Sequence, residues 1–337
     1  MTEARRPVKA PRRWTGATTC PIQRRMTSRI ISRSGIEAAA GRILPHIRHT
    51  PVLDLPAAAL GAACAVTLKL EGMQVSGSFK ARGAFNALLQ SGAREVIAAS
   101  GGNHGAAVAH AAGALGIGAE IYVPAISAAS KVARIREAGA VVVQGGATYA
   151  EAFAASEARR AETGAVSVHA YDQAEVLEGQ GTVAREFEAD SPGLTHVLVA
   201  VGGGGLIGGM AAWFAGGPTQ LVAVEPEGCP TFHEALRAGA PVDAPVGGLA
   251  ADSLGARRVG ALMFGVARDV VGCSVLVPDE AIRDAQRRLW SAARVVAEPG
   301  GATALAALIS GAWVPPEGAR VGVLVCGGNC EPGSVVG

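Results

Sequence analysis

Val199-Ala-Val-Gly-Gly-Gly-Gly-Leu206 is the most informative segment of the chain for predicting its fold. It consists of a short apolar run, four consecutive glycines and a leucine. It lies inside a segment from Ser191 to Val224 that contains no Asp, Glu, Lys or Arg. An isolated membrane helix tolerates four glycines poorly. We therefore predict a buried strand, a glycine turn, a buried helix and the start of another strand, with no membrane span. Successive N–H groups in such a turn bind a phosphate or another anion.

Short β-branched runs alternate with alanine-rich helical stretches on both sides of this segment. The pattern predicts strands over 95–99, 120–123, 141–144, 166–170, 197–201, 221–225 and 321–325, and helices over 104–115, 127–138, 148–162, 176–188, 206–214 and 279–294. Such alternation indicates an α/β fold in which parallel sheets are flanked by helices. Since one core rarely exceeds about 250–300 residues, 337 residues predict two lobes.

Composition and charge exclude several classes of protein. With 49% hydrophobic and 17% charged residues, the chain is not a disordered scaffold. The net charge is +2, but residues 1–25 alone carry seven Lys or Arg side chains and one Glu. We interpret 1–25 as a disordered basic extension and Met26 as the start of the folded part. No basic stripe with aromatic residues follows, so no nucleic-acid partner is expected. With no apolar signal segment and scattered cysteines, the protein is expected to be cytoplasmic.

Lysine is scarce in this chain, and one lysine stands in a glycine- and serine-rich context. Only Lys9, Lys69, Lys80 and Lys131 are present, and Lys80 follows a Ser-Gly-Ser turn that starts at Ser76. Arginine cannot lose its proton to act as a nucleophile, whereas a desolvated lysine can form a Schiff base. The pattern leaves two interpretations of Lys80 equally open, a catalytic amine or a surface lysine at a helix start.

Two further polar turns follow predicted strands. Ser100-Gly-Gly-Asn-His-Gly105 precedes a helix, and free N–H groups at a helix start bind carboxylates or phosphates. The simpler interpretation of this segment is a tight turn with an N-cap. Val325-Cys-Gly-Gly-Asn-Cys330 follows the last predicted strand, where Cys326 either faces a ligand crevice or is an ordinary buried thiol.

A dinucleotide site is an alternative interpretation of the glycine turn. The spacing Gly203, Gly205 and Gly208 matches the G-x-G-x-x-G pattern, and Glu225 ends the next predicted strand as a candidate ribose ligand. A nicotinamide-dependent oxidoreductase would bind its cofactor there. A protein that binds amino acids without catalysis is a second alternative from another class.

These elements, in this order, resemble the fold-type II pyridoxal-phosphate enzymes, in particular the serine/threonine dehydratase group. The resemblance extends over roughly 28–334 and includes the segments His49-Thr-Pro-Val-Leu, Ala251-Asp-Ser and Ala297-Glu-Pro-Gly-Gly-Ala. It implies a two-lobed fold like that of the tryptophan synthase β chain, with pyridoxal 5'-phosphate as cofactor. It further implies that Lys80 holds the cofactor covalently and acts as the catalytic base. The implied cofactor ligands are Phe79, Lys80, Asn103, Gly202, Gly203, Gly204, Gly205, Leu206 and Cys326. The implied substrate ligands are Ser76, Ser100, Gly101, Asn103 and His104.

The implied reaction is dehydration and deamination of L-threonine or L-serine to 2-oxobutanoate or pyruvate and ammonia. Other hydroxyamino acids, such as 3-hydroxyaspartate or a phenylserine, and serine racemisation remain alternatives. Racemases of the group place a serine directly after the position of Ser100, where this chain has Gly101, which disfavours racemisation. Many relatives bind a cation at the position of Glu225, but Thr231 replaces the expected second acid, so we predict no metal.

The resemblance also predicts how the chain is organised. It implies a large cofactor-binding domain formed by 26–90 and 166–337, with a small domain over 91–165 inserted in it. It implies a small hydroxyamino acid as the ligand partner and a homodimer as the assembly.

Overall fold

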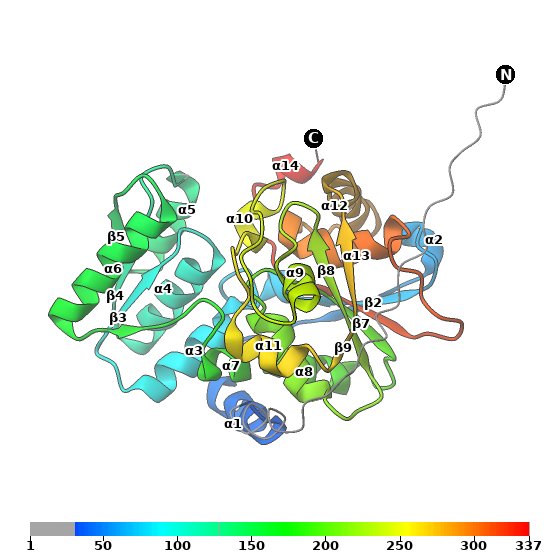
Figure 1. The fold of residues 1–337 in the computed structure, drawn as a ribbon, viewed down its shortest axis with the longest axis horizontal. Coiled ribbons are helices and arrows are strands. Elements are labelled where there is room, and N and C mark those ends of the chain that lie inside the picture. The colour runs from blue at the N-terminus through cyan, green and yellow to red at the C-terminus, as the bar shows by residue number, and fades with distance from the viewer. Residues whose placement is uncertain (1–30, 128, 337) are drawn as a thin grey trace.

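Two sheets, each flanked by helices, form the core of the protein (Figure 1). The computed structural model describes residues 31–127 and 129–336, so the predictions for 1–25 and Met26 lie outside the described residues. A six-stranded sheet has the order β1-β2-β10-β7-β8-β9, and a four-stranded sheet has the order β5-β4-β3-β6. All neighbouring strands are parallel except β1 and β2. The predicted fold class is confirmed.

The strands and helices follow the predicted alternation. The strands are β1 Val52–Leu55, β2 Val66–Leu70, β3 Glu95–Ala99, β4 Gly118–Val123, β5 Val141–Gln144, β6 Val166–Ser167, β7 His196–Ala200, β8 Gln220–Pro226, β9 Val271–Val277 and β10 Val321–Val325. The first helices are α1 Arg33–Ile43, α2 Ala57–Leu60, the 3₁₀ turn η3 Glu71–Met73, α3 Lys80–Ser91, α4 Asn103–Leu115, α5 Ala129–Glu137, α6 Tyr149–Thr163 and α7 Ala174–Asp190. The later helices are α8 Gly205–Phe214, α9 Thr231–Ala238, α10 Ala251–Leu254, α11 Ala261–Ala267, α12 Asp279–Ala293, α13 Pro299–Ile309 and α14 Gly333–Val336.

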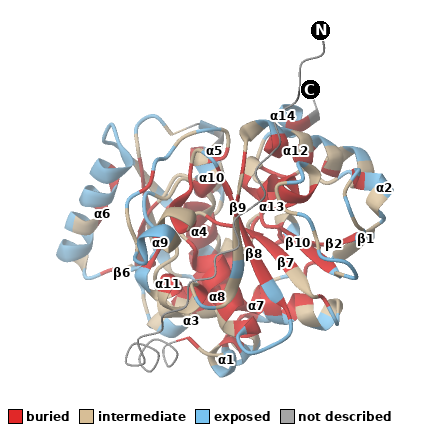
Figure 2. Cartoon of the chain, turned by 45° about the vertical axis from the view of Figure 1, so that its right-hand side comes forward, coloured by how far each residue is buried: buried red, intermediate tan, exposed pale blue. Residues whose placement is uncertain are grey.

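The large lobe comprises the six-stranded sheet and the helices that cover it. Helices α12 and α13 lie on one side of this sheet, and α1, α7 and α8 lie on the other (Figure 1). Strands β7, β8 and β10 are buried on both faces, which explains why they are nearly continuous apolar runs (Figure 2). No helix in the described part of the chain combines the length and apolar character needed to cross a bilayer.

The small lobe comprises the four-stranded sheet with α4, α5 and α6. Its core of alanine and valine side chains continues into α3, so the two lobes share a packed junction. Strand β6 belongs to this sheet although it lies just beyond residue 165, where the sequence places the end of the small domain. The outer face of α6 is exposed (Figure 2).

The charge-free segment folds as predicted, with β7, the glycine turn, α8 and β8 following one another. The strand predicted over 166–170 is too long, because β6 ends at Ser167. The reason is a local turn: His169 Nδ1 accepts hydrogen bonds from the backbone N–H groups of Tyr171, at 3.2 Å, and Asp172, at 2.8 Å. This side chain satisfies the backbone in place of a neighbouring strand.

Candidate active site

A cavity opens where the carboxyl ends of β7 and β10 meet the start of α3. We call it the inner cavity. Open α/β sheets bind ligands at this end of their strands. The lining residues come from both lobes: Phe79, Lys80, Asn103, Ala200, Gly202, Gly203, Gly204, Gly205, Leu206, Ser253, Leu254, Glu298, Gly300 and Cys326.

Lys80 is the first residue of α3 and its ammonium group is buried in this cavity. Its Nζ donates a hydrogen bond to the carbonyl oxygen of Ala170 at 2.7 Å. Burial lowers the pKa of Lys80 to about 8, although the nearby Cys326 and Glu298 oppose this shift. Because the charged form is disfavoured, much more of this amine is neutral near physiological pH than for an exposed lysine. A neutral, buried amine is the form that attacks carbonyl groups.

The glycine loop, Gly202–Gly205, connects β7 to α8 and presents its backbone N–H groups without partners. Within the described residues, no acceptor is found for these N–H groups, whereas the carbonyl of Gly202 accepts from Thr231 Oγ1 at 2.9 Å. The loop must be glycine for steric reasons. A Cβ on Gly205 would lie 2.9 Å from the backbone of Tyr171, and Gly204 has a φ of +89°. The loop therefore forms a cradle for an anion at a helix start.

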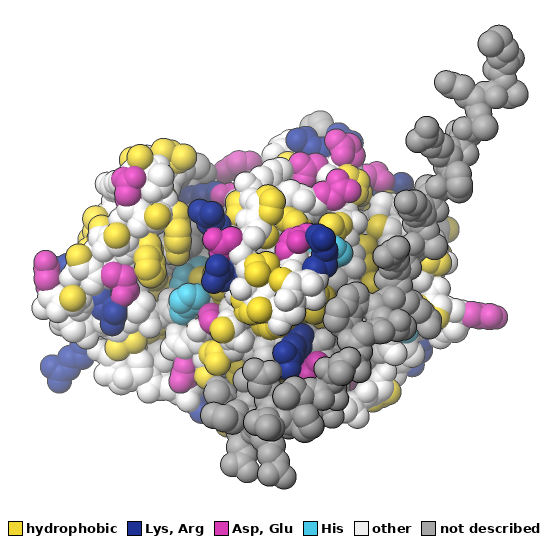
Figure 3. All heavy atoms as spheres, in the orientation of Figure 1, with side chains coloured by type: hydrophobic (Ala, Val, Ile, Leu, Met, Phe, Trp, Pro, Cys, Tyr) yellow, Lys and Arg dark blue, Asp and Glu magenta, His cyan; other side chains and the backbone are white. Residues whose placement is uncertain are grey.

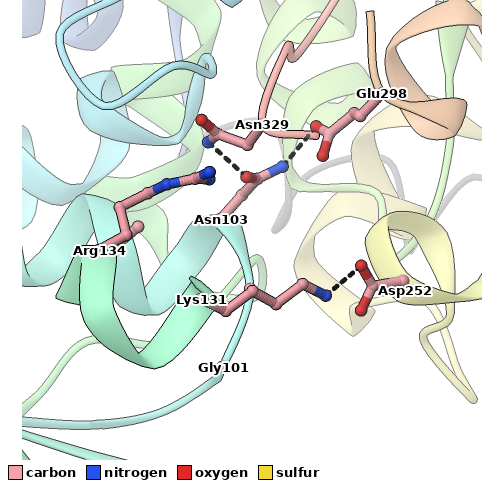
Figure 4. A pocket seen from close by; sticks show the side chains of 9 residues that line it. Gly101, Asn103, Lys131, Arg134, Asp252, Glu298 and Asn329 are labelled. Carbon is pink, nitrogen blue, oxygen red and sulfur yellow. Dashed lines mark hydrogen bonds and ion pairs between the residues drawn. The ribbon is translucent and has the colours of Figure 1, made fainter. Parts of the chain in front are cut away.

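A chain of side-chain amides fixes the orientation of Asn103 (Figure 4). Asn329 Nδ2 donates to Asn103 Oδ1 at 2.7 Å and also to the carbonyl of Ser76 at 2.9 Å. Asn103 Nδ2 in turn donates to Glu298 Oε1 at 2.5 Å. Because Asn103 Oδ1 already accepts a hydrogen bond, the amide cannot flip. Its second Nδ2 hydrogen is left for a ligand in the cavity.

Cys326 and Glu298 are both buried beside Lys80. Burial raises the pKa of the Cys326 thiol well above its ordinary value, so this group stays protonated, and its Sγ lies 3.4 Å from the carbonyl oxygen of Gly300. Burial raises the pKa of Glu298 to about 7, opposed by the hydrogen bond from Asn103. The cavity thus offers a neutral thiol and a carboxyl group that is partly protonated near neutral pH.

Beneath the first turn of α3 lies a buried ion cluster formed by Lys69, Glu71, Arg82 and Glu186. Arg82 Nε and Nη2 donate to the two carboxylate oxygens of Glu71 at 2.8 and 2.6 Å, and Arg82 Nη1 donates to Glu186 Oε2 at 3.0 Å. Lys69 Nζ donates to Glu186 Oε1 at 2.7 Å. Although burial alone would raise the pKa of Glu186, Arg82 and Lys69 lower it to about 2. Since Arg82 stands two residues after Lys80, the cluster anchors the turn that carries the reactive amine.

The residues predicted to bind the cofactor all lie together in the inner cavity. All nine line it: Phe79, Lys80, Asn103, Gly202, Gly203, Gly204, Gly205, Leu206 and Cys326. Of the residues predicted to bind substrate, Asn103 lines it, and Gly101 lines an adjoining cavity described below. The roles of these residues stay predictions.

Three predicted substrate ligands line neither cavity: Ser76, Ser100 and His104. The Oγ of Ser100 accepts from the N–H of Gly102 at 3.2 Å. His104 is buried, and its Nε2 donates to the carbonyl oxygen of Val168 at 2.8 Å. Burial and the nearby Lys80 charge lower the pKa of His104 to about 3, so the ring is neutral. The His104 ring therefore cannot bind a carboxylate as a cation.

Several residues that line the two cavities have no role predicted from the sequence. Glu298 and Ser253 fall in segments quoted for their family resemblance, and Asn329 falls in the turn after Val325, so their positions carried a signal. Nothing in the sequence pointed to Arg134, and the only indication for Lys131 was that lysine is scarce in this chain.

The interpretation of the glycine turn as a dinucleotide site is wrong. Glu225 is fully buried, and it accepts hydrogen bonds from the backbone N–H groups of Phe232 at 2.7 Å and His233 at 2.8 Å. A carboxylate enclosed by the first turn of α9 cannot contact a ribose. Gly208 packs inside α8, where a Cβ would lie 2.6 Å from Met263 Cβ.

Glu225 is also not part of a metal-ligand cluster among the described residues. The one such grouping in this part of the chain is His49, Glu186 and Asp190. Lys69 Nζ already donates to Glu186 and to Asp190, each at 2.7 Å, so a cation occupies the place between the two carboxylates.

Comparison with known proteins identifies the family of this chain. A family model described as "Pyridoxal-phosphate dependent enzyme" matches residues 43–327. The chain is 34% identical over 310 residues to a serine racemase of Oryza sativa subsp. indica, covering 88% of this chain and 91% of the relative. It is 35% identical over 313 residues to a phenylserine dehydratase of Ralstonia pickettii, covering 90% and 95%. A solved threonine deaminase from T.th. superposes with a TM-score of 0.83 at 34% identity, covering 89% of this chain and 99% of that one.

The chain belongs to the pyridoxal-phosphate-dependent enzymes, the family that also contains these hydroxyamino-acid enzymes. The predicted family and cofactor are confirmed.

The inner cavity has the chemistry that this cofactor needs. The unpartnered N–H groups of the glycine loop suit its phosphate, and the buried Lys80 amine suits its aldehyde. Asn103 has a free donor, and Cys326 is a neutral thiol. We propose that these four elements hold the cofactor.

The lowered pKa of Lys80 gives a measurable pH dependence. We expect the apoprotein to bind pyridoxal phosphate covalently at a rate that rises as the pH increases through about 8 and then levels off. The reason is that only the neutral amine attacks the aldehyde, and its fraction increases until the pKa is passed. Rapid mixing followed by visible absorption measures this rate. A rate that still rises about tenfold per pH unit between about pH 9 and 10 would show an unshifted lysine.

Proposed function

We propose that this protein eliminates water from a β-hydroxy amino acid and releases a 2-oxo acid and ammonia, with L-threonine and L-serine as the first substrates to test. The observation that carries the proposal is the buried Lys80 amine, with its lowered pKa, in one cavity with the unpartnered glycine loop. The names of the relatives support it, because each denotes an enzyme of a hydroxyamino acid.

Lys80 is the proton-transfer group in this proposal. When bound, pyridoxal phosphate supplies a sink for the electron pair of the Cα–H bond. The neutral Nζ of Lys80 takes the α proton, since it is the buried amine beside the reacting carbon. The α proton and the β-hydroxyl leave as water. The released enamine then adds water and gives the 2-oxo acid and ammonia.

Other residues orient the substrate and set the charge of the site. Helix α4 begins at Asn103, which lines both cavities, and we assign the α-carboxylate to the N–H groups of this helix start. Asn103 is held in one orientation by Glu298 and Asn329, and we assign it the ring hydroxyl of the cofactor. The neutral Cys326 thiol does not enforce protonation of the pyridine nitrogen. This arrangement suits elimination better than reactions that need a long-lived carbanion.

Gly101 favours elimination over racemisation. It lines the mouth of the site and has no side chain, so it cannot donate a proton to the face of Cα opposite Lys80. A Cβ at this position would lie 3.0 Å from Ser127 Oγ, so the loop is also closely packed against the segment that follows β4 within the small lobe.

The test is product analysis with purified, cofactor-loaded protein. We expect 2-oxo acid and ammonia in equal amounts from a hydroxyamino acid, without accumulation of the D-isomer on chiral chromatography. D-serine as the main product from L-serine would instead establish a racemase. Visible cofactor absorption without any product from threonine, serine, 3-hydroxyaspartate or phenylserine would overturn the proposed activity.

A further inference from the structure

A second cavity, the outer cavity, adjoins the inner one and shares Asn103 and Glu298 with it. Its lining residues come from α4, α5, α10 and the segments around 298 and 329: Gly101, Gly102, Asn103, Ala106, Lys131, Arg134, Asp252, Glu298 and Asn329. It lies at the junction of the two lobes, where basic and acidic side chains gather on the surface (Figure 3). Since the inner cavity suits the cofactor, the outer cavity is the space next to it for a substrate.

Two cations from α5 enter the outer cavity. Lys131 and Arg134 are three residues apart on the helix, so they lie on the same face. Lys131 Nζ pairs with Asp252 of α10 across the junction of the lobes. The guanidinium of Arg134 points toward Asn103 and Asn329 (Figure 4). Within the described residues, Arg134 makes no ion pair or side-chain hydrogen bond, although it is half-buried.

The outer cavity holds more positive than negative charge near neutral pH. Asp252 neutralises Lys131, and Glu298, whose pKa burial raises to about 7 against the opposing charges of Lys131 and Arg134, carries only part of a negative charge there. The α-carboxylate of an amino acid is already served by the first turn of α4. A monocarboxylic substrate would therefore leave the half-buried guanidinium of Arg134 without a fully charged anionic partner in this cavity.

We propose that Arg134, supported by Lys131, binds a second carboxylate on the substrate, so that the preferred substrate is a β-hydroxy amino acid with a side-chain carboxylate, such as 3-hydroxyaspartate. This inference rests on the proposed function. The reaction keeps the same balance: the α proton and β-hydroxyl leave as water, and the enamine adds water to give oxaloacetate and ammonia. Arginine suits this role because its planar guanidinium binds a carboxylate through two parallel hydrogen bonds.

The first test compares kcat/KM for 3-hydroxyaspartate and L-threonine in wild type, Arg134→Gln and Arg134→Lys. We expect Arg134→Gln to lower the ratio of the two kcat/KM values by about 10- to 100-fold, mainly through KM, because hydrogen bonds to charged groups are strong and uniform binding acts on KM. Arg134→Lys should restore part of the preference. The control is Arg136→Gln, an exposed residue of the same helix that lines neither cavity, which should leave both substrates unchanged.

The second test does not depend on turnover. Calorimetry measures the binding of succinate and butyrate, two unreactive four-carbon acids that differ by one carboxylate. We expect wild type and Arg136→Gln to bind succinate at least about tenfold more tightly than butyrate, and Arg134→Gln to lose this preference.

The outcomes separate this inference from the proposed function. Selective succinate binding without any elimination would retain the dicarboxylate site and overturn the proposed activity. Elimination with equal losses for threonine and 3-hydroxyaspartate in Arg134→Gln would show that Arg134 binds the α-carboxylate, and would overturn the inference. Elimination with no preference for dicarboxylates in wild type would also overturn it.

Discussion

Replacing Lys80 with alanine is expected to lower the rate of 2-oxo acid formation by about 10⁴-fold, because the change removes both the covalent link to the cofactor and the base that takes the α proton. The effect should appear mainly in kcat, since the amine acts at the reacting carbon and contributes little to substrate binding. Steady-state kinetics with cofactor-saturated protein, together with the visible absorption of the bound cofactor, measure it.

The matched control for this prediction is Lys80→Arg. Arginine keeps the positive charge and most of the length of the side chain, but it cannot lose a proton or form a Schiff base. We expect Lys80→Arg to be as inactive as Lys80→Ala. Restoration of more than a few per cent of the wild-type rate by Lys80→Arg would contradict a role for the neutral amine and would assign Lys80 a purely electrostatic function.

Replacing Arg82 with methionine is expected to lower the free energy of unfolding by about 3–5 kcal/mol, because it leaves the carboxylate of Glu71 buried without its cation. The side chains of Arg82 and Glu71 are both 0% exposed, so water cannot replace the lost hydrogen bonds. Glu186 retains Lys69 as a partner and is affected less. Chemical denaturation of the apoprotein measures the change.

Two controls separate a buried charge from a general packing defect. Glu71→Gln added to Arg82→Met removes the uncompensated charge and should recover a large part of the loss. Arg160→Met breaks an exposed pair with Glu157 and should leave the unfolding midpoint unchanged. A loss in Arg82→Met that Glu71→Gln does not relieve would show that volume rather than charge determines the effect.

Some features of the site could be predicted because the chemistry restricts the residue type. Only glycine fits the loop from Gly202 to Gly205, where an added Cβ would meet Leu254, Tyr171 or Met263. Among the basic residues, only lysine supplies a neutral amine at position 80. These requirements are visible in the one-dimensional sequence. In the same way, the burial of β7 and β10 on both faces requires apolar runs, so the central strands were predictable.

Other features depend on packing between distant segments. Lys131 and Asp252 are 121 residues apart in the sequence and meet only when the lobes assemble. The charges on α5 look like those of any solvated helix face, so the contribution of α5 to the outer cavity could not be predicted from the sequence. The predicted strand over 166–170 failed for a similar reason, since the turn at His169 depends on one side-chain acceptor.

The central place of β10 in the large sheet has a consequence for how the protein is made. This strand lies between β2 and β7, and the residue that follows it, Cys326, accepts a hydrogen bond from the N–H of Phe79 at 3.2 Å. A nascent chain whose residues 321–325 are still inside the ribosome therefore lacks the strand between β2 and β7. Pairing strands so far apart in sequence is slow.

Assembly of the cofactor site depends on the pairing of β10 for the same reason. Until β10 is inserted, the sheet does not connect β2, which precedes Lys80, to β7, which precedes the glycine loop. A chain in which β10 is not yet paired therefore exposes the edges of β2 and β7, and open strand edges are prone to aggregation. Production in cells that lack the vitamin from which pyridoxal phosphate is made would lower the yield of active enzyme. The rate at which the chain is synthesised would not change.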